Sequence, residues 1–344
     1  MTNFVQLHLL TSYPPANLNR DDLGRPKTAR MGGVDRLRVS SQSLKRHWRT
    51  SEVFEEALAG HIGTRTKRLG ADVERHLVDG GVKEKSAHEW ARAIAGVFGK
   101  LQQKDSADIE QLAHISPEER DAVFALADTL IAENRAPDDE ELKLLRHRPS
   151  AADIALFGRM LAADPGFNVE AACQVAHAIT VHRVAVEDDY FTAVDDLNEG
   201  DEDMGAAHIG ETGFAAGLFY SYLCIDRDQL VANLDGDEAL ADRAMAALTE
   251  AAVKVSPRGK QNSFGSRAYA SYVLAERGPQ QPRSLSVAFL KPVKGEGDDA
   301  VDALERQVSN FDAVYGECAD GRCRLSALTG EGSLDALKRF VTQG

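Results

Sequence analysis

The chain has 344 residues, of which 43% are hydrophobic and 27% are charged, and its formal net charge is −14. A chain of this length and apolar content can bury a sizeable core, which excludes an intrinsically disordered protein and predicts one large domain with elaborations, or two domains. No run of about 18 apolar residues and no signal-peptide pattern occurs, so we expect no membrane span, no membrane partner and a cytoplasmic location.

The first predicted element is a strand at residues 4–10, where apolar and polar residues alternate. Residues 11–30 follow; they are rich in Pro, Asn, Asp and charge and have no periodicity, which predicts a long loop. Loops of this length inside a compact domain are usually functional. This loop contains Asn19 and Arg20, followed by two aspartates, so Arg20 could contact a phosphate or be neutralised by its neighbours.

The segment of residues 32–49 concentrates positive charge. A glycine pair precedes a short alternating segment, and then Ser40 begins a predicted helix as its N-cap. The backbone N–H groups at such a helix start can bind a phosphate. Lys45 and Arg49 are four residues apart, so both project from one helix face.

The count of charged residues identifies the same region. Residues 18–49 contain nine Lys or Arg and three acids, in a chain that is acidic overall. Local cations on an acidic background are sufficient for binding a nucleic-acid backbone, because that binding depends on counterions displaced at particular positions. A solvated basic surface with no ligand would explain the same charge pattern equally well.

Residues 55–167 differ in character. Apolar residues recur at helical spacing in residues 87–101 and 118–133, and Gly and Pro positions separate these runs. We therefore expect an inserted, mostly helical lobe whose apolar stripes form a core. The lobe ends near Gly158, Arg159 and Met160, a combination that suits a close backbone approach to a ligand, although a helix C-terminus also explains the glycine.

Alternation returns at residues 175–181 and predicts another strand. His177 and His182 lie in or beside it without a carboxylate or thiol at a telling spacing, so we expect structural rather than catalytic histidines.

Residues 187–213 then carry nine acids up to Asp203 and neither Lys nor Arg. Paired acids could bind Mg²⁺ in a nuclease. Two-metal chemistry needs carboxylates from several elements, which favours a solvated, projecting arm.

The remaining elements complete the fold prediction. They are strands at 217–225, 268–274 and 284–290, helices at 237–255, 299–315 and 333–341, and a basic turn at 257–265. Without the lobe and the arm, the order strand, helix, strand, strand, helix, strand predicts an α+β, ferredoxin-like (RRM-type) fold with one sheet face covered and the other free. Phe219, Tyr220 and Tyr222 fit no RNP pattern, so RNA would be held by edges and loops.

The four cysteines agree with a reducing compartment, where thiols are usually inert. Cys318 and Cys323 are close enough in sequence for a disulfide or half of a metal site. No second Cys or His cluster lies near them, so we predict no metal and no cofactor.

Five sequence blocks occur in order over the first two thirds of the chain. They are the amino-terminal stretch with NRDD at 19–22 and VSSQSLKR at 39–46, then GRM at 158–160, AHAIT at 176–180, FTAVDDL at 191–197 and AHIG at 207–210. These blocks resemble the CasC family, the backbone subunits of the type I-E CRISPR surveillance complex Cascade, within the repeat-associated RNA-binding superfamily.

The resemblance implies a hand-shaped, non-catalytic protein. It has an RRM-like palm (residues 1–54 and 168–344), a helical fingers lobe (55–167) and a projecting thumb (187–213). Several copies would stack head to tail along a CRISPR guide RNA, and each thumb would displace one base at regular intervals. The implied partners are the guide RNA, further copies of the chain, the large, small, five-prime-handle and hairpin-processing subunits of Cascade, and target DNA through guide pairing.

The resemblance also implies an RNA-binding site without catalytic or metal-binding residues. Matching positions place guide-backbone contacts at Arg20, Ser40, Gln42, Lys45 and Arg49, base contacts at Met160 and Ile209, and the thumb root at Thr192. The same segments and the basic turn add Asn19, Arg38, Arg46, Gly158, Arg159, Lys260 and Gln261.

Two other functions stay open at this point. One is a metal-dependent ribonuclease that uses Asp188, Asp195 or Asp196, because backbone subunits of related complexes cut RNA with a loop aspartate. The other is an RNA-binding protein that works alone.

Overall fold

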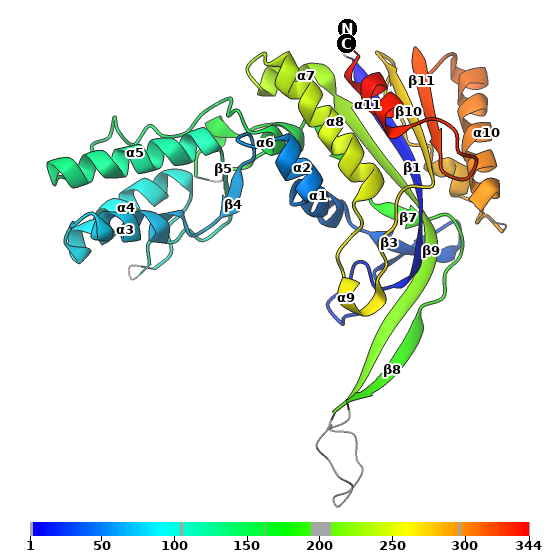
Figure 1. The fold of residues 1–344 in the computed structure, drawn as a ribbon, viewed down its shortest axis with the longest axis horizontal. Helices are drawn as coiled ribbons and strands as arrows, with labels where there is room; N and C mark the ends of the chain where they lie inside the picture. Colours follow the sequence, from blue (N-terminus) through cyan, green and yellow to red (C-terminus); the bar gives the residue numbers. More distant parts are fainter. Residues whose placement is uncertain (1–2, 104–105, 162, 194–207, 295–296, 344) are drawn as a thin grey trace, which may run out of the picture.

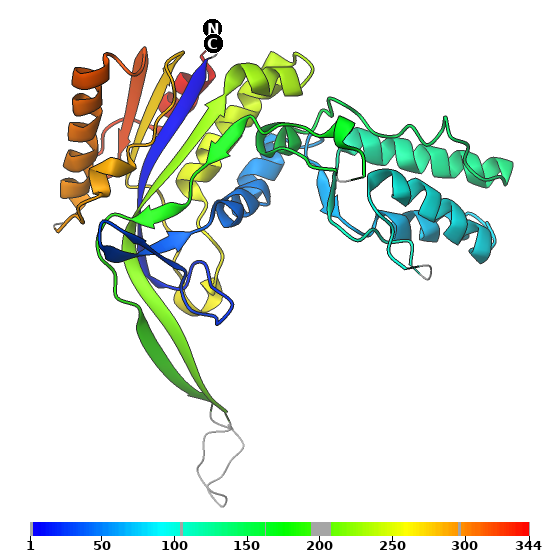
Figure 2. The same cartoon turned by 180° about the vertical axis from the view of Figure 1, so that it is seen from behind.

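The computed structural model describes residues 3–103, 106–161, 163–193, 208–294 and 297–343. A long sheet with helices on both faces forms the main body, a helical lobe extends to one side, and a β-ribbon projects from the sheet (Figures 1 and 2). Within these ranges, no helix is both long and apolar enough to cross a membrane.

All strand pairs in the main sheet are antiparallel. The order is β11 (Gly321–Ser326), β10 (Tyr272–Gly278), β1 (Phe4–Ala16), β9 (His208–Asp226), β7 (Ala178–Thr180), β3 (Val34–Val39) and β2 (Thr28–Met31), with β6 (Cys173–Val175) and β8 (Glu187–Ala193) also paired to β9. Leu7 of β1 lies opposite both Leu223 and Ala275. This register puts apolar side chains from three adjacent strands on one face.

Alternation along β1 separates two cores. Val5, Leu7 and Leu9 join the larger core with α1 (Ser41–Arg49), α2 (Glu52–Ala57), α8 (Glu238–Lys254) and α11 (Leu334–Thr342). Leu10 joins the core of the opposite face, under η2 (Ser286–Phe289) and α10 (Gly297–Tyr315). The prediction of a free second face is therefore wrong. Tyr220 is buried there, so it cannot stack on a base.

The helical lobe has a core of its own. It contains α3 (Leu69–Asp79), α4 (Glu84–Phe98), α5 (Pro117–Glu133), β4 (Thr64–Thr66) and β5 (Ala113–Ile115), and we call these elements the fingers. Trp90, Ile94 and Val123 pack in this second cluster. Ser116 and Glu119 form a capping box that begins α5. The shorter helices of the chain are α6 (Ala152–Phe157), η1 (Pro165–Phe167), α7 (Arg227–Asn233) and α9 (Gln261–Phe264).

Long periodic segments were predicted correctly. The helices expected at 87–101, 118–133, 237–255, 299–315 and 333–341 are α4, α5, α8, α10 and α11, and the strands expected at 4–10 and 217–225 lie within β1 and β9. The helix expected after Ser40 is α1, with Ser40 as its N-cap.

Several predictions of shorter elements and of element boundaries were wrong. The loop at 11–30 is shorter because β1 continues to Ala16 and β2 begins at Thr28, and the strand at 175–181 is two short strands. The strand at 268–274 begins only at Tyr272, and the cysteine-bearing loop contains β11. The expected strand at 284–290 is η2, because Leu285 and Phe289 are one helical turn apart and both are buried against the sheet.

Candidate nucleic-acid interface

The start of α1 is fixed by two hydrogen bonds. The Ser43 N–H donates to Ser40 Oγ (3.3 Å), and the Ser40 N–H donates to Asn19 Oδ1 (2.9 Å). Ser40 is also buried. Asn19 and Ser40 therefore position the 17–27 loop against the helix start, with both side-chain oxygens acting as acceptors.

The exposed surface of α1 is cationic. Gln42 and Arg46 are exposed and Lys45 is half-buried. The Lys45 ammonium lies 5.9 Å from the centre of the Phe157 ring. In the described part of the chain, neither Lys45 nor Arg46 forms an ion pair, so both charges are available to a ligand.

Arg49 lies in different surroundings from Lys45. Its Nη1 is 3.2 Å from Asp153 Oδ2, and its side chain is 15% exposed. His114 Nε2 lies 2.8 Å from the same carboxylate oxygen, and the Gly63 N–H donates to the other oxygen. Burial alone would raise the pKa of Asp153, but the hydrogen bond and charge of His114, together with Arg49, hold that pKa below its usual value. Arg49 thus connects α1 to the fingers, whereas the sequence predicted that Arg49 contacts RNA.

Gly158, Arg159 and Met160 have three different environments. Gly158 ends α6 with φ +80° and ψ 163°, and a Cβ there would lie 3.0 Å from the Val169 carbonyl oxygen, so the glycine permits a close approach to the chain's own backbone. Arg159 was expected to contact RNA, but its side chain is 0% exposed and its Nη1 lies 2.7 Å from Glu119 Oε2, so it has no surface to offer a ligand. Met160 is 83% exposed.

Arg36 was counted among the cations of residues 18–49, but it is not at the surface. Its guanidinium donates to the carbonyls of Thr180 (2.9 Å) and Phe289 (2.8 Å) and is buried between η2 and the sheet. Burial lowers its pKa. Arg36 stabilises the fold and contributes nothing to the exposed positive charge.

Arg20 and Arg38 remain at the surface. Arg20 is exposed and forms no ion pair with a described residue, and Asp21 Oδ1 accepts from the Leu23 and Arg25 N–H groups (2.9 Å each). Arg38 Nη1 lies 2.9 Å from His177 Nδ1. Partial burial and then the charges of Arg38 and Lys27 lower the pKa of His177, so the ring is neutral and accepts the hydrogen bond.

His182 has a structural role, as the sequence predicted. The Leu218 N–H donates to His182 Nε2 (3.0 Å), which leaves Nδ1 to donate to the Arg183 carbonyl (2.9 Å). Both ring nitrogens are used within the fold.

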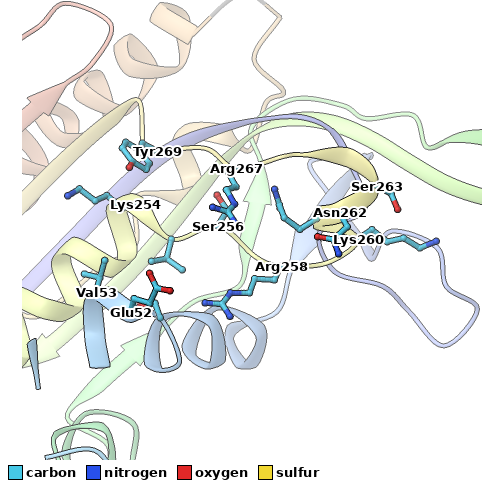
Figure 3. Close-up of a pocket in the computed structure, with 13 residues that line it drawn as sticks. Glu52, Val53, Lys254, Ser256, Arg258, Lys260, Asn262, Ser263, Arg267 and Tyr269 are labelled. Atoms are coloured by element: carbon cyan, nitrogen blue, oxygen red, sulfur yellow. The ribbon is translucent and has the colours of Figure 1, made fainter. Parts of the chain in front are cut away.

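The basic turn borders a groove of about 830 Å³ between the start of α2, the end of α8 and α9 (Figure 3). Four cations line this groove against the single acid Glu52: Lys254, Arg258, Lys260 and Arg267. We call it the basic groove. Lys254 is paired with Glu250 (2.7 Å), whereas Arg258 and Arg267 are exposed and form no ion pair with any described residue.

The turn beside the groove is held in place on both sides. Lys260 has φ +49° and its Nζ donates to Thr212 Oγ1 of β9 (3.1 Å). A Cβ at Gly259 would lie 2.3 Å from the Leu18 carbonyl oxygen, so the close approach to the 17–27 loop requires glycine. The Gln261 side chain lies within hydrogen-bonding distance of Ser266 and stays inside the turn.

A second hollow of about 550 Å³ adjoins the basic groove. Arg20 and Asn19 line it from the loop, Ser43 and His47 from α1, and Arg258 from the turn. Asp21 and Asp22 also line this second hollow. Because Arg258 lines both hollows, they form one continuous basic surface from Arg20 to Arg267, with five Lys or Arg side chains against three acids. Sequence analysis identified the turn at 257–265 but missed Arg267, which lies between it and the strand predicted at 268–274, and Tyr269, which lies at the start of that predicted strand.

The thumb expected at 187–213 is a two-stranded ribbon in its described part. Thr192 of β8 is exposed and pairs with Ile209 of β9, so these two predicted site residues are brought together by backbone register. Asp188 pairs with Arg25 (2.9 Å). Asp195 and Asp196, the other nuclease candidates, lie outside the described residues.

No group of three or more His, Cys, Asp or Glu side chains in the described ranges is placed to hold a metal ion. Cys318 and Cys323 are both free thiols, so they form no disulfide.

The profile of the CT1975-like protein family matches residues 5–340. The chain belongs to the CT1975-like protein family. A search of curated proteins finds no match to this CT1975-like protein.

Solved structures similar to this CT1975-like protein include two chains of CRISPR assemblies. One, from a "CRISPR RNA-guided surveillance complex, pre-nicking", is 30% identical with a TM-score of 0.83, and the match covers 98% of this chain and all of the other. The second, from a "CRISPR RNA-guided surveillance complex", is 25% identical with a TM-score of 0.72, covering 98% and 99% of the two chains. The fold, including its antiparallel sheet, is thus shared with subunits of these complexes.

Proposed function

We propose that this CT1975-like protein is a non-catalytic, guide RNA-binding subunit of a Cascade-type CRISPR surveillance complex. The observation that carries the proposal is the continuous basic surface from Arg20 to Arg267 on a chain whose net charge is −14. The similarity over nearly the whole chain to subunits of CRISPR RNA-guided complexes supports the same function.

The chemistry of this surface suits an RNA backbone. Arg20 and Arg258 line it, and Lys45 and Arg46 lie on α1, the helix that contributes Ser43 and His47 to it. None of these four cations forms an ion pair in the described part of the chain, so each can displace a counterion from a phosphate. The contacts are to the backbone, so base edges stay available for pairing with target DNA. Met160, exposed on the side of the fingers, can contact a base by its apolar side chain.

As part of the same proposal, we infer that the chain is a CasC-like backbone subunit of a type I-E complex and that it acts in the cytoplasm. The strand order β10-β1-β9-β7, with α1 and α8 on one face, supports an RRM-type palm (residues 1–54 and 168–344) and a fingers insertion (55–167). Copies would assemble head to tail along the guide, since a repeated heterologous interface produces an open helix. The projecting ribbon would displace guide bases at intervals. The other Cascade subunits would bind the ends and the length of this filament.

The experiment compares two double charge reversals in RNA-binding assays over a salt series. Lys45→Glu with Arg46→Glu should weaken guide RNA binding and reduce the slope of log affinity against log salt by about 0.7 for each lost phosphate contact. Lys83→Glu with Lys85→Glu is the matched control, because both lysines are exposed on the fingers away from the basic surface.

Equal RNA affinity in the two variants, with native circular dichroism, would overturn the assigned surface. RNA cleavage in Mg²⁺ that is lost on Asp188→Ala would support the ribonuclease instead. Binding that stays at one copy per RNA as the guide is lengthened would support a protein that works alone.

A further inference from the structure

We propose that the basic groove holds a single-stranded segment of RNA, with Tyr269 stacked against one unpaired base and Arg258 and Arg267 bound to the phosphates on either side of it. This inference rests on the proposed RNA-binding function and adds to it a base contact within the palm. None of the contacts implied by the CasC resemblance involves Tyr269.

Tyr269 is an exposed aromatic residue on a fixed backbone. Its side chain is 66% exposed, whereas the next residue, Ala270, is buried and its N–H donates to the Val253 carbonyl (2.8 Å) at the end of α8. On the other side, the Ala268 N–H donates to Ser256 Oγ (2.8 Å), and that hydroxyl lies 2.9 Å from the Ala268 carbonyl. The ring is therefore presented to solvent from a backbone segment that is already ordered before binding.

The charges around Tyr269 point to an anionic ligand. Figure 3 shows Tyr269 and Lys254 at one end of the groove, with Arg267 and Arg258 between them and Lys260. Lys254 is held by Glu250 and Lys260 donates to Thr212, which leaves Arg258 and Arg267 with most of their donors available. An exposed aromatic side chain beside arginines is the combination by which proteins bind single strands: the ring stacks on a base and the cations hold the backbone.

A single strand fits this site better than a duplex. Stacking on Tyr269 needs the face of an unpaired base, which a duplex does not present. The hollow with Arg20 continues from Arg258, so a strand that leaves Tyr269 can pass from Arg258 to Arg20, with its phosphates on these two side chains and away from Asp21 and Asp22. The close approach of Gly259 to Leu18 fixes the backbone of the basic turn against the 17–27 loop, so this part of the backbone is already ordered before a ligand binds.

The test uses a mixed-sequence single-stranded RNA with 2-aminopurine at successive positions. Stacking should quench the fluorescence at a particular position in the wild-type complex. Tyr269→Ala should abolish that quenching and weaken binding on the order of 10- to 100-fold, while Tyr269→Phe keeps both, because the stacking face is retained. The salt slope should stay unchanged in Tyr269→Ala and fall when Arg258→Gln and Arg267→Gln are combined.

The controls separate this inference from the proposed function. If Lys45→Glu with Arg46→Glu weakens RNA binding but Tyr269→Ala behaves like Tyr269→Phe, the stacking site is wrong and the RNA-binding function stands. If Tyr269→Ala leaves RNA affinity intact and instead prevents association between copies of the chain, the groove binds protein, and the inference is overturned. Affinity for a fully paired RNA hairpin should be the same in wild type and Tyr269→Ala.

Discussion

Two sets of arginines in this chain have opposite surroundings. Arg46 on α1 and Arg258 on the basic surface are exposed on the palm and have no ion-pair partner among the described residues. Arg49 and Arg159 lie at and beyond the junction with the fingers, and each is paired with a buried acid. All four occur in segments that the sequence assigned to RNA binding. Positive charge alone therefore does not identify a ligand contact, because a distant acid decides whether the charge is available.

The physical reason lies in desolvation. A charge that leaves water must be compensated by a partner, so Arg159 requires Glu119 and Arg49 requires Asp153. An exposed cation keeps its hydration and needs no partner in the folded chain. Such a cation can exchange its water for a phosphate oxygen of a nucleic acid.

The largest effect is expected from breaking the fully enclosed pair. Arg159→Met leaves Glu119 buried without its cation and should lower the free energy of unfolding by about 3–5 kcal/mol. Urea unfolding followed by circular dichroism measures this change. Arg148→Ala is the matched control, since Arg148 pairs with Asp235 at the exposed surface and its removal should change stability little. Equal stabilities of the two variants would contradict the distinction between enclosed and open arginines.

An intermediate effect is expected at the palm–fingers junction. Asp153→Asn removes the negative charge that Arg49 and His114 share and should cost about 1–3 kcal/mol. Hydrogen exchange at the Gly63 amide, which donates to Asp153 Oδ1 (2.8 Å), should become faster. If Arg49 is instead an RNA contact, the substitution would raise RNA affinity and leave exchange at Gly63 unchanged.

The smallest effect concerns the pH dependence of stability. It involves another enclosed group, His8, whose Nε2 lies 3.2 Å from Glu276 Oε2. Burial lowers the pKa of His8 below its usual 6.5, although the hydrogen bond to Glu276 opposes this shift. The unfolded chain therefore takes up a proton below pH 6.5 that the folded chain resists, so stability falls as the pH is lowered through that value.

His8→Gln removes this titration. Between pH 6.5 and about 5, its unfolding free energy should depend less on pH than that of the wild type, by at most about 1.4 kcal/mol per pH unit. Urea unfolding at a series of pH values measures the slope. Parallel slopes for the two proteins would show that His8 does not titrate on unfolding.

Local patterns were sufficient to predict some of the fold and some of the candidate site. The cap at Ser40 and the apolar stripes of α4, α5 and α8 are properties of short segments, so they were predictable from sequence. The partners of Arg49 and Arg159 are 104 and 40 residues away, and no local pattern indicates them. η2 was mistaken for a strand because a short apolar run has no decisive period.

Tyr269 was missed for a related reason. A single tyrosine in a segment expected to be a strand gives no sign that its ring faces solvent. Its position becomes significant only when the end of α8 and the basic turn are seen to form the walls of one groove (Figure 3).

Strand β9 is one uninterrupted element of 19 residues that pairs with β8 in the projecting ribbon and with β1 and β7 in the palm sheet. At about 3.3 Å per residue it is roughly 60 Å long. The Lys260–Thr212 hydrogen bond ties its ribbon portion to the basic turn. This single strand therefore joins the ribbon, the centre of the palm sheet and, through Lys260, the basic turn in one continuous set of hydrogen bonds.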